Sequence, residues 1–156
     1  MEWQRLARFV LSGNHELEEY AILAARIALG LFFAISGANK LFVPSQTQTM
    51  YETLVAANVP FPHIMTYFVS SAEFVGGLML MAGFLTSLAC IALMGDMTVA
   101  LLTTKIAGLP KGVSPLNWLD NFLYLPEALY VLLFIWLICS GPGQFSIDRK
   151  LGARLQ

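Results

Sequence analysis

Apolar residues form four long runs along the chain, and each run is about long enough to cross a lipid bilayer. A transmembrane helix needs about 20 predominantly apolar residues. The runs cover residues 21–43, 63–83, 86–107 and 122–140. Only Phe84 and Leu85 separate the second run from the third, so we expect a tight antiparallel hairpin there. The pattern predicts an all-α integral membrane four-helix bundle, with one transmembrane domain over residues 1–156.

Two shorter segments are amphipathic and too polar to span. Residues 1–10 place apolar side chains on one helical face beside Arg5 and Arg8, which predicts a short helix in the membrane interface. A disordered tail is the alternative. Pro44 ends the first run, and residues 45–58 then predict an amphipathic helix between the first two spans, over one mouth of the bundle.

Composition supports the membrane assignment. Hydrophobic residues make up 57% of the chain and charged residues 12%, whereas a soluble domain has about 45–50% and 25%. The net charge of −1 gives no basic surface for nucleic acid. Cys90 and Cys139 lack the spacing of a thiol relay or zinc site, and His15 and His63 fall at opposite membrane edges. No metal or haem is therefore expected.

The basic residues predict the orientation of the chain. Lys and Arg in excess mark the cytoplasmic side of a membrane protein. They gather near the two termini, at Arg5, Arg8, Arg149, Lys150 and Arg154. We therefore expect residues 1–20 and 141–156 to be cytoplasmic or interfacial, which agrees with an even number of spans.

Ionisable side chains lie inside the predicted spans. Such a group costs about 2.5–3.5 kcal/mol on insertion scales, so it normally has a partner and often a function. Glu73 and Asp96 each lie ten residues into their spans, roughly 15 Å deep at 1.5 Å per residue. If they face each other in a dry site, both cannot be ionised, and one becomes a proton acceptor. The alternative is a protonated carboxyl group that only holds two helices together.

A second polar group is expected in the outer half of the bundle. Helical side chains lean toward the helix N-terminus, so Lys40 and Glu127, on helices of opposite direction, converge in depth. Glu73 leans the same way and can join them. The polar neighbours expected around this site are Ser36, Asn39 and Tyr130. The alternative is a salt bridge that merely orders the bundle.

Arg26 leans toward the cytoplasm, and we expect it to snorkel to the interface. Pairing with Asp96 or Asp148 is the alternative. Small residues allow helices to pack closely. We expect such packing, rather than ligand access, at Gly30, Gly37, Gly76 and Gly77.

Several of these residues form an ordered combination. The first span carries Arg26, Gly30, Phe33, Ser36-Gly37 and Lys40-Leu41, and the second carries Glu73, Gly76-Gly77 and Gly83. The tail GPGQFSIDRK contributes Gly141, Pro142, Gly143, Ser146 and Asp148. The combination covers nearly all of the chain after residue 20 and resembles the DoxX family of small bacterial membrane proteins. Asp96 departs from the family pattern.

The resemblance implies four transmembrane helices in the bacterial inner (cytoplasmic) membrane. Some members of the family are subunits of a thiosulfate:quinone oxidoreductase, and others are similar to parts of membrane redox assemblies that handle thiol stress. Many members have no assigned activity. The resemblance carries over no catalytic residue set.

We therefore expect a quinone-linked redox partner or subunit of a membrane oxidoreductase complex. A quinone would bind between the spans, with Lys40 or Arg26 donating to its carbonyl oxygen and Glu73, Asp96 or Glu127 handling protons. A partner protein would exchange electrons with it. Two alternatives stay open: a small proton-coupled transporter, and a non-catalytic scaffold or assembly factor. The sequence decides neither catalysis nor homo-oligomer formation.

Overall fold

The computed structural model describes residues 15–154 and the side chains from residue 17 onward. The predicted interfacial helix over residues 1–10 lies outside this range. The described part is all-helical, without a strand. Its main helices are α2 (His15–Phe42), α3 (Pro44–Ala56), α4 (Pro62–Ala82), α5 (Thr86–Ala100), α6 (Pro115–Leu123), α7 (Pro126–Ser140) and α8 (Ile147–Gly152). A π-helical turn, η1 (Leu101–Lys105), and a 3₁₀ turn, η2 (Ile106–Gly108), continue α5.

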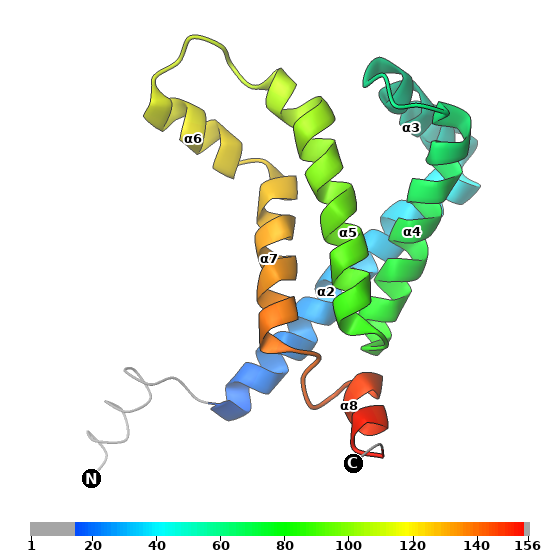
Figure 1. The fold of residues 1–156 in the computed structure, drawn as a ribbon, viewed down its shortest axis with the longest axis vertical. Helices are drawn as coiled ribbons and strands as arrows, with labels where there is room; N and C mark the ends of the chain where they lie inside the picture. Colours follow the sequence, from blue (N-terminus) through cyan, green and yellow to red (C-terminus); the bar gives the residue numbers. More distant parts are fainter. Residues whose placement is uncertain (1–14, 155–156) are drawn as a thin grey trace.

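The helices confirm the predicted membrane bundle. Three are long and apolar enough to span a bilayer: Leu17–Phe42, Pro62–Ala82 and Thr86–Gly108. The α6–α7 pair satisfies the same criteria only as a bent unit. In Figure 1, α2 crosses α4, and α7 stands beside α5. The first described residues and α8 lie at one end of the bundle, while α3 and α6 lie at the other.

The predicted fourth span, residues 122–140, is divided between two helices. α6 ends at Leu123, α7 begins at Pro126, and the two axes are bent by 68°. Proline disfavours the α conformation in the residue before it. Leu125 is accordingly extended, with φ −72° and ψ 120°. Only α7 therefore runs alongside the other spans, and α6 turns away across its end (Figure 1).

The predicted amphipathic helix between the first two spans is confirmed as α3. Val43 is extended, and Pro44 occupies the first turn of α3, where its missing N–H costs nothing. The Thr47 hydroxyl donates to the Lys40 carbonyl oxygen at 2.6 Å and ties the new helix to the end of α2. Leu54 is buried, whereas most of the helix is exposed. The kink thus folds α3 back beside α4.

The hairpin between α4 and α5 is as tight as predicted. Gly83 has φ +66°, a left-handed conformation that glycine adopts without steric cost. Leu85 also adopts a left-handed conformation, with φ +47°, before α5 begins at Thr86. From this turn, α4 and α5 diverge toward the end of the bundle where α3 lies (Figure 1).

Glycines bring α2 and α4 into backbone contact, which confirms the predicted close packing. A β-carbon at Gly77 would lie 2.6 Å from the Gly30 carbonyl oxygen, and one at Gly37 would lie 2.7 Å from the Ser70 carbonyl oxygen. Both distances are shorter than a carbon and an oxygen tolerate. Behind this contact, the fully buried side chains of the core include Phe33, Leu80, Leu93, Phe134 and Leu137.

We predict that Gly37→Ala destabilises the bundle by about 1–3 kcal/mol, because the added methyl group must push α2 and α4 apart. The matched control is Gly95→Ala on α5, where nothing lies within 4 Å of the new methyl group. Alanine there should be neutral or stabilising, by up to about 1 kcal/mol. The free energy of unfolding, from denaturant titration in mixed micelles, distinguishes them. Equal values for the two variants would contradict the prediction.

Candidate functional site

A cavity of about 590 Å³ lies between α3, α4, α5 and η1, where α4 and α5 diverge. Small-molecule sites in proteins are typically about 300–1,000 Å³. Its walls are mostly apolar and include Leu54, Met65, Phe68, Val69 and Met97. Its charged lining residues are Lys40, Glu73, Asp96, Lys105 and Glu127. The structure therefore brings the three predicted acids and Lys40 to one cavity, with Lys105 added.

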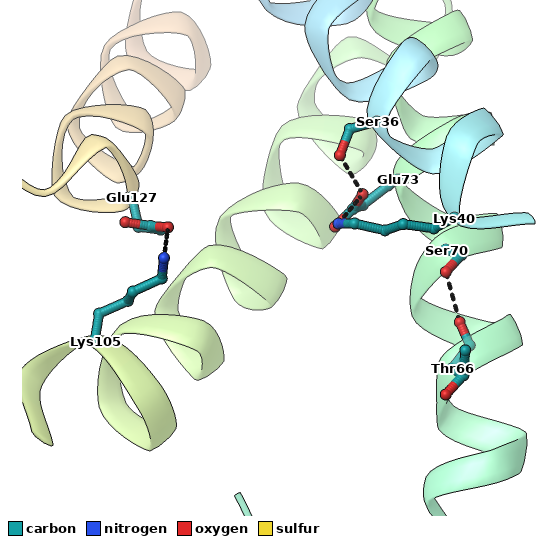
Figure 2. A network of polar contacts seen from close by, with 7 residues as sticks. All are labelled: Ser36, Lys40, Thr66, Ser70, Glu73, Lys105 and Glu127. Carbon is teal, nitrogen blue, oxygen red and sulfur yellow. Dashed lines mark hydrogen bonds and ion pairs between the residues drawn. The ribbon is translucent and has the colours of Figure 1, made fainter. Parts of the chain in front are cut away.

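Lys40 and Glu73 form a close ion pair between α2 and α4. The Lys40 Nζ atom lies 2.6 Å from both carboxylate oxygens of Glu73. Ser36, one turn before Lys40 on α2, donates a 3.1 Å hydrogen bond to Glu73 Oε2. Glu73 is only 2% exposed, whereas Lys40 is 25% exposed. Figure 2 shows both α2 side chains directed at the carboxylate, which is held at the wall of the cavity.

The predicted pairing of Lys40 with Glu127 is wrong. Glu127 instead pairs with Lys105, whose Nζ atom lies 2.9 Å from Oε1 (Figure 2). Glu127 falls in the first turn of α7, because that helix begins at Pro126. Lys105 ends the π-helical turn η1, and such wide turns are frequent at functional sites. The two ion pairs are separate but line the same cavity.

Two carboxylate oxygens at the cavity are buried without a hydrogen-bond partner among the described residues. They are Asp96 Oδ2 and Glu127 Oε2. Asp96 on α5 also lies close enough to Glu73 on α4 for their carboxyl groups to interact, as their equal depth predicts. Buried polar groups are nearly always hydrogen-bonded. Each of these two oxygens can therefore accept a hydrogen bond from a ligand in the cavity.

Two of the predicted neighbours lie outside the cavity. Asn39 is exposed on the outer side of α2. The Tyr130 ring packs against the rings of Phe32 and Phe33, with centroids 5.0 and 5.4 Å apart. Neither residue lines the cavity, whereas Ser36 reaches it through Glu73.

The predicted snorkelling of Arg26 is wrong. The residue is 1% exposed, and its side chain contacts the segment between α7 and α8. The guanidinium donates 2.7 Å hydrogen bonds to the carbonyl oxygens of Pro142 and Phe145. The segment after α7 folds over the end of the bundle where α8 lies, so Arg26 meets backbone acceptors before it reaches water. The structure does not bring Arg26 to the cavity.

Asp148 lies at the same end of the bundle. We call Arg26 and Asp148, together with the backbone and side-chain groups to which they are hydrogen-bonded, the terminal clamp. The Asp148 carboxylate accepts from the Leu85 N–H at 2.7 Å and from the Thr86 N–H and hydroxyl at 2.8 and 2.7 Å. Its own N–H donates to the Gly83 carbonyl oxygen at 2.9 Å. Burial acts to raise the pKa of Asp148, but the hydrogen bonds from Thr86 and Leu85 and the charge of Arg26 hold that pKa below its ordinary value. The tail motif thus closes the α4–α5 turn.

Comparison with known proteins gives a consistent classification. The family model described as DoxX matches residues 21–106, which include Lys40, Glu73 and Asp96. The Uncharacterized membrane protein Rv3486 of Mycobacterium tuberculosis is 29% identical over 140 residues, 86% of this chain and 83% of the relative. The Inner membrane protein YqjF of Escherichia coli is 30% identical over 141 residues, 89% of this chain and 98% of the relative. No solved structure gives a significant match.

We predict strong coupling between Lys40 and Glu73. Lys40→Met should lower the free energy of unfolding by about 3–5 kcal/mol, because it leaves a buried carboxylate without its cation. The double variant Lys40→Met/Glu73→Gln should recover much of this loss, since no uncompensated charge remains. A double-mutant cycle from denaturant unfolding in mixed micelles measures the coupling. Losses that simply add in the double variant would show that the pair is not coupled.

We predict that Asp148→Asn changes how stability depends on pH. A carboxyl group whose folded-state pKa is depressed stabilises the fold above its unfolded pKa, about 3.9. That stabilisation is lost as pH falls below about 4 and through the folded-state pKa. The stability difference between wild type and Asp148→Asn should therefore be full at pH 6 and shrink toward pH 3.

Thermal unfolding of both proteins across this pH range measures the effect. Asp120→Asn is the matched control, because Asp120 is an exposed residue of α6. The stability of Asp120→Asn should differ little from that of wild type at every pH. If the stability difference between wild type and Asp148→Asn stayed constant from pH 6 to pH 3, the Asp148 pKa would not be depressed in the folded protein.

Proposed function

Because this chain belongs to the DoxX family, we propose that it is the quinone-binding membrane subunit of an oxidoreductase complex. Its place would be the bacterial inner membrane, with both termini cytoplasmic. The Escherichia coli relative, Inner membrane protein YqjF, supports that location by its name. The observation that carries the proposed activity is the cavity, which combines apolar walls with five charged residues, among them the buried Glu73.

The volume and lining of the cavity suit a lipophilic carrier with a polar ring. The apolar side chains from α3, α4 and α5 would contact a ring face and the start of an isoprenoid tail. The charged groups would contact the ring oxygens. Ligand sites commonly combine a largely apolar lining with a few convergent polar groups.

The chain's own residues have distinct roles in this proposal. An ammonium group has three N–H donors. Two of those of Lys40 serve the Glu73 oxygens, which leaves one for a ligand oxygen. Glu73 and Asp96 line the cavity, and they would exchange protons with the ring oxygens. Reduction of a quinone to a hydroquinone takes two electrons and two protons, so acids beside the ring have a function. A partner redox protein would exchange the electrons.

We expect quinone to copurify with the wild-type protein in native-lipid particles and to be depleted in Glu73→Gln and Lys40→Met. The first variant removes the buried charge, and the second removes the donor to the ring. Mass spectrometry of extracted lipids, normalised to protein, measures the enrichment. Asp120→Asn on exposed α6 is the control and should retain quinone.

The alternatives make different predictions. A proton-coupled transporter would move protons or substrate in liposomes without any partner protein. In a scaffold, Glu73→Gln would change stability and no ligand content. Equal quinone content in folded wild type and both cavity variants would refute the proposed function.

A further inference from the structure

The polar atoms of the cavity can be divided into those already paired and those left free. Lys40 is bound to both oxygens of Glu73, and Lys105 is bound to Oε1 of Glu127. Each cation of the cavity therefore has a carboxylate partner, and Lys40 keeps one N–H that can donate to an oxygen of either redox form. The two atoms left buried without a partner among the described residues are Asp96 Oδ2 and Glu127 Oε2. Both residues line the cavity, on different helices.

The two free carboxyl oxygens determine which kind of ligand should bind most tightly in the cavity. A carboxyl oxygen that carries no proton accepts hydrogen bonds and donates none. A buried acceptor without a partner destabilises the protein, and a donor on the ligand would remove that cost. The two free oxygens therefore favour a head group that donates hydrogen bonds.

We propose that the cavity selects the hydroquinone over the quinone, with Asp96 and Glu127 accepting hydrogen bonds from the two ring hydroxyls. This inference rests on the proposed function and specifies which redox form the site prefers. The hydroquinone has two O–H donors, whereas the quinone presents two carbonyl acceptors to carboxylate acceptors. Because the two forms share ring and tail, the apolar walls do not distinguish them. The discrimination comes from Asp96 and Glu127.

The preference has an electrochemical consequence. Tighter binding of the reduced form raises the midpoint potential of the bound couple. For a two-electron couple, each tenfold preference corresponds to about 30 mV. The bound carrier would therefore be a stronger oxidant than the same carrier free in the membrane, and it would draw electrons from the partner protein.

The test compares three ligands that differ only in their ring oxygens: a short-tailed hydroquinone, the matched quinone and the hydroquinone dimethyl ether. Each is titrated anaerobically by calorimetry against the full chain in lipid nanodiscs. We expect the hydroquinone to bind at least tenfold more tightly than the other two. The dimethyl ether should resemble the quinone, because it keeps the ring but lacks donors.

Substitutions at Asp96 and Glu127 test whether these two residues cause the preference for hydroquinone. Asp96→Asn and Glu127→Gln each replace a carboxylate oxygen with an NH₂ donor and change the volume very little. Each should weaken hydroquinone binding about fivefold or more and tighten quinone binding. Asp120→Asn should leave both affinities unchanged. The melting temperature of each variant confirms that it is folded.

The outcomes separate this inference from the function on which it rests. Equal or tighter binding of the quinone by wild type would overturn the hydroquinone preference and leave the proposed function standing. An unchanged preference in both folded cavity variants would also overturn the roles of Asp96 and Glu127. Failure of all three ligands to bind would refute the proposed function itself.

Discussion

Backbone atoms of α2 and α4 touch where Gly30 faces Gly77 and where Gly37 faces Ser70. The short distance between the two helices determines which polar side chains can form hydrogen bonds across the interface. Ser36 has one of the shortest polar side chains, so its 3.1 Å hydrogen bond to Glu73 depends on the helices being this close. The bond and the Lys40 ion pair together satisfy a carboxylate that is 2% exposed. The charged wall of the cavity is thus a consequence of helix packing on the glycine face.

The two ends of the bundle are built differently. At the end where α8 lies, the terminal clamp joins α2, the α4–α5 turn and the tail through the hydrogen bonds that Arg26 donates and Asp148 accepts. At the other end, α4 and α5 diverge, and the cavity opens between them. The clamp fixes where α5 starts relative to α2 and α4. Small changes in the direction of α5 would therefore alter the cavity and leave the clamped end unchanged.

The sequence predicted features that depend on distance along the chain. Helix lengths, the break at Pro44, the tight hairpin and the equal depth of Glu73 and Asp96 all follow from counting residues. Partners were harder to predict, because they depend on how each helix is rotated and on what lies beside it. Lys105 pairs with Glu127 from a π-helical turn, which the pattern of apolar residues does not predict. Arg26 finds its acceptors on a backbone segment more than a hundred residues away.

The bend before Pro126 has a consequence for the lipid around the protein. α7 has 15 residues, so at 1.5 Å per residue it is about 22 Å long, against about 30 Å for the hydrocarbon core of a bilayer. A short hydrophobic segment is accommodated by local thinning of the bilayer or by association with other short segments. The lipid beside α7 should therefore be compressed, and neighbouring proteins with short spans should gather on that side. Hydrophobic mismatch alone would then give this bundle a preferred face for assembly.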